Sequence, residues 1–505
     1  MLERLMFWKK KEETKKADSR KAIDTELLEM DFLCQLSYMA AIATSGIDRG
    51  GLFSHAAKLP YLSAAYFKRV VFVAKAFNHD YSEACNIVGQ ATREVQIKEL
   101  LLRFSGALSS GEDIIKFLER ECEVFSETYG NSYERKLDSL AKWTDAYVAL
   151  IMTTAIVTVM AVVTLMIGNA TVGFIISLSV VTIIVTIAGA WFINKAAPKE
   201  PKTHSLPQRS REQDIARLVA QIILPAGVIF FLILLLSKAD VGWMMVSTGA
   251  FLFPLGLVSK LDDIKISKRD SDIAGFLRSL GGVSQAIGAT VNEAIGRLDF
   301  RALGSLANDV DLLFVRLLAR IDPALCWNRF VSETGSEQVS RSVRIFWDAV
   351  ALGGEPQRIG NHAGNFAMKI ALLRAKRGMI GAGFLWLTMV MQVVLCSLLV
   401  FIYQTMITFT DLIQGMAPDM SGVQLASGLP TFAMFNTDTG ELGLLFFMIV
   451  VIILVLTLSN SFSIYSISGG HIFNFAFYLS IALVIAGLAV VMIPPMVGIL
   501  FNTII

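Results

Sequence analysis

Residues 146–168 read AYVALIMTTAIVTVMAVVTLMIG and contain no charged side chain. As an α-helix this stretch would be about 34 Å long, which is enough to cross the hydrocarbon core of a bilayer, about 30 Å thick. A second uncharged stretch, residues 171–193, follows after only Asn169 and Ala170. So short a connection predicts two antiparallel membrane helices, and with them an all-α membrane protein.

Five further apolar stretches bring the expected number of membrane spans to about seven. We predict the spans at residues 146–168, 171–193, 215–236, 241–259, 378–407, 442–458 and 478–501. The composition agrees, because 54% of the 505 residues are hydrophobic and only 17% are charged, against roughly 25% in soluble chains. Disordered, collagen-like and disulfide-rich secreted proteins are excluded, and so is a single soluble enzyme domain.

Two long charged segments separate the groups of spans. We expect residues 31–145 and 260–377 each to form a helical bundle, because apolar residues recur in them at helical spacing. Asp270 and Ser271 are placed to cap a first helix of the second bundle. The remaining segments are predicted to be a charged tail at residues 1–30, a basic linker at residues 194–214 and a loop at residues 408–441.

Lysine and arginine indicate the orientation, because they favour the cytoplasmic ends of spans. They flank the first four spans and the start of the fifth on one side, and residues 378–505 contain neither. The first 21 residues also lack the apolar core of a signal peptide. We therefore expect the N-terminus and both bundles in the cytoplasm, the loop 408–441 outside the cell membrane and, after seven spans, an external C-terminus.

The two charged segments carry the same landmarks at nearly equal spacing, which predicts a duplication. The proposed pairs are Phe32-Leu33 with Phe276-Leu277, Gly46 with Gly288, Ala84-Cys85-Asn86 with Leu325-Cys326-Trp327-Asn328, and Gly111-Glu112 with Gly354-Glu355.

Motifs of catalysis are missing from the sequence. It contains no GxxxxGK[ST] phosphate loop and no HExxH zinc motif, and its five cysteines form no CxxC pair. The centres of the spans carry no carboxylate, which disfavours a membrane peptidase or a proton-coupled carrier. We expect no enzyme activity, cofactor or metal, and a formal net charge of +2 does not suggest a nucleic-acid partner.

The second bundle resembles the F-domain of type II secretion systems. The resemblance rests on Asp272-Ile273-Ala274-Gly275-Phe276-Leu277-Arg278, Gly288-Ala289-Thr290 and Ala349-Val350-Ala351-Leu352-Gly353-Gly354-Glu355. Four spans after the first copy and three after the second are similar to the archaeal branch of that family, which includes the J-type membrane platform of the archaellum, the archaeal flagellum. Ser468-Gly469-Gly470-His471 also resembles that branch, and the resemblance covers residues 30–505.

The resemblance implies a platform in the cytoplasmic membrane at the base of a type IV pilus-like filament. A hexameric ATPase would dock on the cytoplasmic domains, and pilin- or archaellin-like subunits would be inserted into the filament, which in an archaellum could also turn. A homodimer is implied as well. A platform of an archaeal adhesion pilus or secretion machine is the alternative within the family, and a secondary transporter is the alternative from another class.

Charged side chains are the candidate contacts for such partners. The candidates for the ATPase are Lys265, Lys268, Arg269, Arg278, Arg341, Arg344, Glu355 and Arg358 in the second bundle, with Gly111 and Glu112 in the first. The candidates for anionic membrane lipid are Lys9, Lys10, Lys11, Lys15 and Lys16. A solvated surface with a cytoplasmic excess of positive charge is the simpler interpretation of the basic residues in the second bundle, and a disordered charged tail is the alternative for the five lysines.

Overall fold

The computed structural model describes residues 27–166, 172–204, 206–237, 240–416 and 439–504. Over these ranges the chain is helical without a strand, apart from an isolated β-bridge between Thr203 and Ser336. Seven of the described helices are long and apolar enough to cross a membrane. These features confirm the predicted all-α fold of a polytopic membrane protein.

Some predictions fall on residues outside the described ranges. They concern the five lysines of the N-terminal tail, the connection between the first two spans and most of the loop 408–441. The part of that loop that the structure describes is helical up to residue 416, so the fifth membrane helix is longer than predicted.

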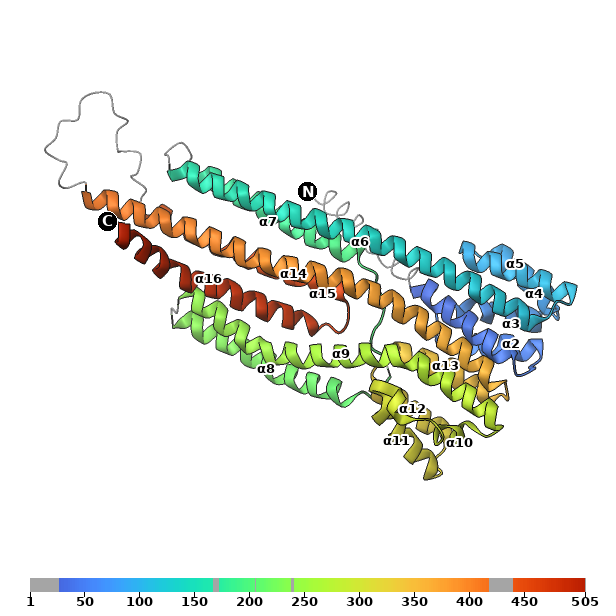
Figure 1. Ribbon diagram of the computed structural model, residues 1–505. Helices are drawn as coiled ribbons and strands as arrows, with labels where there is room; N and C mark the ends of the chain where they lie inside the picture. The colour runs from blue at the N-terminus through green and yellow to red at the C-terminus, as the bar shows by residue number, and fades with distance from the viewer. Residues whose placement is uncertain (1–26, 167–171, 205, 238–239, 417–438, 505) are drawn as a thin grey trace. The chain divides into compact units, whose positions relative to one another are not determined.

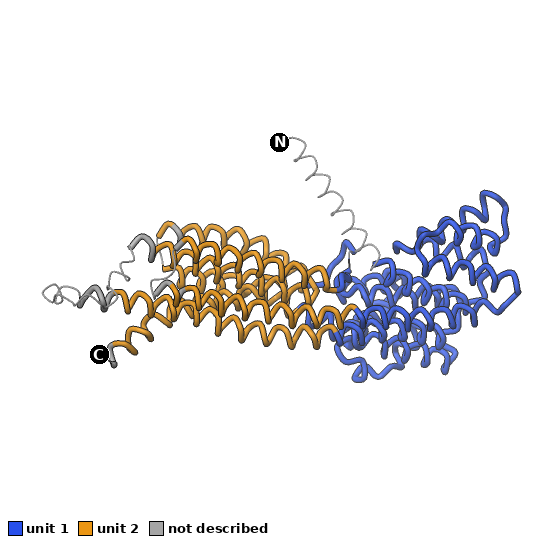
Figure 2. The backbone as a smooth tube through the Cα atoms, turned by 90° about the horizontal axis from the view of Figure 1, so that it is seen from above, with its two compact units in different colours: residues 1–135, 198–211, 262–376 blue, residues 136–197, 212–261, 377–505 orange. Residues whose placement is uncertain are grey.

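Figure 2 colours two compact units of the chain. The described residues of 1–135, 198–211 and 262–376 form unit 1, and those of 136–197, 212–261 and 377–505 form unit 2. Three helices contribute to both units, namely α6 (Ile114–Met166), α9 (Val241–Ile287) and α14 (Pro356–Met416). In these three helices the change from apolar to charged sequence falls within a continuous helix, whereas the linker at residues 198–211 joins the two units outside the helices or at a helix end.

Unit 1 contains two successive sets of helices (Figure 1). The first set comprises a helix over residues 27–43, then α2 (Arg49–Lys58), α3 (Ala64–Ala76), α4 (Tyr81–Ala91), α5 (Val95–Ser110) and the start of α6. The second set comprises the end of α9, then α10 (Val291–Ile295), the 3-10 helix η1 (Phe300–Leu306), α11 (Ala307–Leu318), α12 (Pro323–Thr334), α13 (Glu337–Ala351) and the start of α14.

The ends of corresponding helices in the two sets are built in the same way. Asp80 and Asp322 each cap the next helix, α4 or α12, by accepting a backbone hydrogen bond with the side chain. Gly111 and Gly353 then close α5 and α13 with φ of 73° and 83°, a left-handed conformation that favours glycine. The spacing from aspartate to glycine is identical in the two sets, as a duplication requires.

The structure corrects the register of the proposed repeat. Counted from the capping aspartates, the buried residues of α4 include Cys85 at the place where α12 buries Trp327, so Cys85 does not correspond to Cys326. Gly111 likewise corresponds to Gly353 and not to Gly354. What the two copies share is the pattern of buried positions, and the residue types at these positions differ.

The expected helix start at Asp270 and Ser271 is wrong. Both residues lie inside α9, which continues without a break. The Asp270 side chain is buried and binds other side chains in unit 1, so it does not serve as a cap. The apolar periodicity that begins at this point marks where α9 enters the core of unit 1 and not the start of a helix.

Glycines let α9 and α14 approach each other closely in unit 1. A Cβ atom on Gly281 would lie 2.4 Å from the carbonyl oxygen of Pro356, and one on Gly360 would lie 2.6 Å from that of Leu277. Real Cβ atoms do not come so close to a backbone oxygen, so both positions require glycine for this packing.

Unit 2 contains the remaining parts of α6, α9 and α14 together with α7 (Val172–Ala196), α8 (Arg211–Leu236), α15 (Thr439–Ser468) and α16 (Asn474–Ile504). Its core is apolar and draws on α9, α14, α15 and α16, with Met245, Cys396, Leu399, Ile453 and Ala486 among its buried residues. Glycines at seven-residue intervals in α9, which are Gly242, Gly249 and Gly256, face α16 closely enough that a Cβ would clash.

Candidate partner-binding surface of the helical unit

Arg341, a candidate contact, is buried in the structure with 5% of its surface exposed. Its Nη1 donates to Asp31 at 2.7 Å, its Nε donates to Glu337 at 2.8 Å, and its guanidinium lies over the Tyr61 ring at 4.8 Å. Burial alone would lower the pKa of Arg341, but these neighbours raise it above its ordinary value. Because Asp31 and Tyr61 belong to the first copy, Arg341 joins the two copies and offers nothing to a partner.

Arg344 stands one helical turn further along α13, at the edge of the same contact. Its guanidinium lies 5.9 Å from the centre of the Tyr61 ring. Nearby, the Tyr38 hydroxyl donates to Asp348 at 3.3 Å, again joining the first copy to the second. Burial raises the pKa of Asp348, and the Arg344 charge and the Tyr38 hydrogen bond offset part of that effect.

Arg269 and Arg278 also bind within unit 1. Arg269 forms two hydrogen bonds of 2.8 and 3.0 Å with the Asp309 carboxylate and donates to the carbonyl of Thr334 at 3.1 Å. Arg278 is half-buried and donates to the amide oxygen of Asn365 at 2.7 Å. These two arginines join α9 to neighbouring helices of the second copy, so their guanidinium groups are already bound within unit 1.

The other candidate residues lie at the surface. Lys265 and Lys268 are exposed on α9. Glu355 and Arg358 form an exposed ion pair of 3.0 Å, and Glu112 forms one of 2.8 Å with Arg120. Glu112 follows the left-handed glycine that ends α5 by one residue, and Glu355 follows the one that ends α13 by two residues, so the two carboxylates lie near corresponding helix ends but one position out of register. Exposed pairs of this kind cost little to break, and their side chains are available to a partner.

The linker between α7 and α8 is fixed against the second copy, which the sequence did not reveal. The backbone of Glu337 donates to the carbonyl of Lys202 at 3.1 Å, and that of His204 donates to the carbonyl of Gly335 at 3.4 Å. The Lys202 ammonium pairs with Asp263 at 2.5 Å. Three prolines between residues 198 and 207 restrict the linker to extended conformations, and they are the one sequence signal that favoured such docking.

Arg374 is the centre of this arrangement. It donates to Asp270 at 2.7 Å, to Glu200 at 3.3 Å and to the carbonyl of Pro201 at 3.1 Å. Asp270 also accepts from the Ser336 hydroxyl. In the sequence Arg374 stood out only as a positive charge beside a span, because Asp270, Glu200 and Pro201 are all more than 100 positions away.

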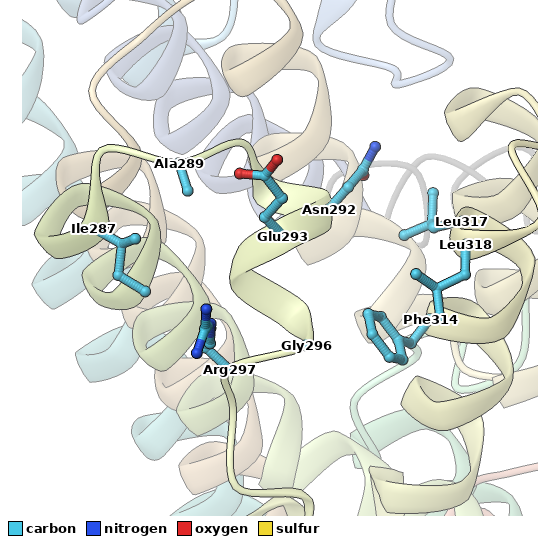
Figure 3. Close-up of a pocket in the computed structure, with 9 residues that line it drawn as sticks. All are labelled: Ile287, Ala289, Asn292, Glu293, Gly296, Arg297, Phe314, Leu317 and Leu318. Carbon is cyan, nitrogen blue, oxygen red and sulfur yellow. The ribbon is translucent and has the colours of Figure 1, made fainter.

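Two hollows open on the second copy beside α11. The first encloses about 400 Å³, and Figure 3 shows it beside α10 with Ile287 and Arg297 on one side and Phe314, Leu317 and Leu318 on the other. The second encloses about 600 Å³ and lies between the linker and α12, lined among others by Pro207, Ile321 and Leu325. The arginines at its edge, Arg316 and Arg329, both pair with Glu333.

The described residues offer neither a metal site nor a charged transport path. Across the described ranges no group of three His, Cys, Asp or Glu residues is arranged to hold a metal ion. Unit 2 does contain a buried polar chain, in which Tyr147 donates to Asn460 at 2.8 Å, Asn460 donates to Gln392 at 2.7 Å and Gln392 donates to Thr457 at 2.8 Å. These side chains are uncharged and bind one another, so they stabilise the helix packing.

The comparisons with known proteins agree with this architecture. Over 329 residues the chain is 25% identical to Flagella accessory protein J of Methanocaldococcus jannaschii, an alignment that covers 61% of the chain and 57% of the relative. The chain resembles the J-type proteins of the archaellum. The protein of the same name from Methanococcus voltae is 22% identical over 321 residues, which is 61% of the chain and 58% of that relative.

The predicted resemblance to J-type proteins is thereby confirmed. The chain spans somewhat more than half the length of these relatives. No family model matches the chain. No solved structure matches it either.

Proposed function

We propose that the chain is the integral membrane platform of an archaeal type IV pilus-like filament machine, in particular of an archaellum. A separate hexameric ATPase docks on unit 1, and its motion drives the insertion of archaellin-like subunits and the rotation of the filament. The chain itself has no enzyme activity. It resides in the cell membrane in contact with lipid, functions as a homodimer, and has a cytoplasmic N-terminus.

Two observations together support the proposal. The chain is similar to J-type proteins, and three of its helices are shared by the two units. α6, α9 and α14 each contribute residues both to the charged unit 1 and to the apolar unit 2. A force on unit 1 would reach unit 2 along continuous hydrogen-bonded helices and would not be lost in flexible loops. The ion pairs of Arg341 and Arg374 would keep unit 1 in one piece under such a force.

We exclude the buried candidate residues from the proposed ATPase contact and keep the exposed ones. We retain Lys265, Lys268, Glu355 and Arg358 on the second copy and Glu112 on the first. Arg341, Arg269 and Arg278 are assigned to internal packing because their charges bind partners within unit 1.

Deletion of the gene and affinity purification of the tagged full chain test the proposal. Deletion should abolish both swimming and the archaellum, and the tagged chain should retain the hexameric ATPase of the archaellum after mild crosslinking. Loss of adhesion pili with normal swimming would assign the chain to a pilus machine instead. Solute flux through the purified chain in liposomes, without any retained ATPase, would support a transporter and refute the platform.

A further inference from the structure

Helix α3 of the first copy exposes a pair of aromatic side chains. Phe72 and Phe77 keep 65% and 64% of their surfaces exposed, and their rings meet edge to face with centroids 6.4 Å apart. Single exposed apolar residues are common on proteins, but two large aromatic rings in mutual contact form a patch that gains free energy when it is covered.

Three positive charges surround Phe72 on the same helix. Lys68 and Arg69 lie one turn before it and Lys75 lies one turn after it, so helical spacing places all three beside its ring. All three are exposed, and α3 contains no aspartate or glutamate.

The nearest carboxylates along the chain are already engaged. Asp80 caps α4 by accepting from the backbone of Ser82 at 3.2 Å, and Glu83 pairs with His79 at 2.8 Å. The α3 surface, defined here as Phe72, Phe77 and the three cations, is therefore apolar at its centre and positive around it.

The corresponding helix of the second copy differs in charge. α11 ends in the same turn as α3, since Arg320 and Asn78 share a left-handed backbone with φ of 55° and 52°. It also exposes apolar side chains, including Leu318. Its charges are balanced, however, because Asp311 lies on the same helix and Arg316 pairs with Glu333. Apolar exposure at this place is common to both copies, and the excess of positive charge belongs to the first.

From these observations we infer that the α3 surface docks an acidic protein segment that carries an apolar anchor. The anchor covers Phe72 and Phe77, and carboxylates on either side of it meet the three cations. This inference rests on the proposed function and refines it, because it places a contact of the ATPase on α3 in addition to the charged residues that follow α5 and α13.

Binding of the purified ATPase to the full chain in lipid nanodiscs tests the inference. The double variant Phe72→Glu/Phe77→Glu should weaken binding by about 10-fold or more, as loss of a central interface anchor does. Lys68→Glu/Lys75→Glu should also weaken binding, and it should reduce the sensitivity of the association rate to salt. Phe72→Ser/Phe77→Ser gives the same test without added charge, should the first variant fold poorly.

Controls come from apolar residues of similar exposure elsewhere in unit 1. Val124→Glu on α6 and Met368→Glu on α14 replace residues that are 53% and 45% exposed, and both variants should bind the ATPase like the unchanged chain. If the unchanged chain binds no ATPase, the proposed function fails. If it binds and the α3 variants bind equally well, or if the controls weaken binding as much, the inference alone fails.

Two other occupants of the α3 surface would also overturn the inference. If Phe72→Glu/Phe77→Glu converts a dimer of the chain alone to a monomer by mass photometry, the surface is covered by a second copy. If a Trp introduced by Phe72→Trp is quenched by brominated lipid in the nanodisc, the surface lies on the bilayer.

Discussion

At the scale of single residues, Arg341 is the side chain whose loss should cost most. Replacing it by Met leaves the buried Asp31 and the partly buried Glu337 without their partner, so we expect Arg341→Met to lower the free energy of unfolding by about 3 to 5 kcal/mol. Denaturant unfolding of the full chain in detergent micelles measures the change.

The exposed pair of Arg358 and Glu355 supplies the control for this prediction. Arg358→Met should alter stability by less than about 1 kcal/mol. Asp31→Asn combined with Arg341→Met should cost less than the sum of the two single changes, since the buried charges are then removed together. Equal effects of Arg341→Met and Arg358→Met would show that Arg341 does not join the two copies.

His471, in the turn between α15 and α16, should make stability depend on pH. Burial and then the positive charge of Arg217 lower the pKa of His471, and its Nδ1 accepts from the backbone of Phe473 at 3.3 Å. The unfolded chain therefore takes up a proton near pH 6.5, about the usual pKa of histidine, while the folded chain resists it. The contribution of neutral His471 to the free energy of unfolding is complete above about pH 6.5 and is lost as the pH falls toward the lowered pKa.

Unfolding measured between pH 7.5 and pH 5 checks this expectation. The decline should not exceed about 1.4 kcal/mol per pH unit for one group, and His471→Asn should reduce it while keeping an acceptor for the backbone of Phe473. Part of the decline should remain, because burial also lowers the pKa of His362. Arg217→Gln should make the fall in the free energy of unfolding smaller, because it removes the repulsion between Arg217 and the protonated ring of His471. An unchanged pH profile in His471→Asn would contradict the assignment.

At the scale of elements, two adjacent glycines of α9 should respond in opposite ways to the same change. A Cβ on Gly281 would strike the backbone of α14, whereas one on Gly282 would meet nothing within 4 Å. We expect Gly281→Ala to destabilise the chain by about 1 to 3 kcal/mol through overpacking. Gly282→Ala should stabilise it by about 0.5 to 1 kcal/mol, because alanine favours the helix. Thermal unfolding of both variants measures the difference, and the same sign for both would refute the close packing of α9 and α14.

The helices themselves could be predicted far better than their ends. Residues 146–168 are uncharged and long, so hydropathy alone indicates a membrane helix there. The sixth span was predicted to end at residue 458, because Ser459, Asn460 and Ser461 lower the hydropathy, yet α15 continues to Ser468. All three side chains are buried, Asn460 donates to Gln392 of α14, and Ser461 donates to the preceding turn of its own helix. A single sequence does not show such partners.

The candidate site was harder to predict for the same reason. A sequence shows that Arg341 and Arg358 are charged but not that one faces Asp31 and the other faces solvent. The exposed aromatic pair on α3 was hidden as well, since a large apolar side chain in a helix is ordinarily expected to be buried. Burial, which separates these cases, depends on helices that are distant in the sequence.

At the scale of the whole molecule, the topology can be tested with cysteines. Ser421→Cys lies in the predicted external loop and should react with an impermeant maleimide in intact cells. Gln208→Cys, in the exposed part of the linker, should react only after permeabilisation. Both are made on a Cys122→Ser background, because the other four native thiols are buried. The reverse pattern of labelling would invert the proposed orientation.

The contact between Asp31 and Arg341 can form only after both residues have been synthesised. The two residues are 310 positions apart, and synthesis proceeds at about 5 to 20 residues per second, so roughly 15 to 60 s pass between the appearance of one and the other. During that interval the first copy is complete but its face around Tyr61 has nothing to cover it. By then the ribosome has synthesised the first four membrane helices. The first copy is therefore held at the membrane and exposed to proteases and chaperones until the second copy is synthesised.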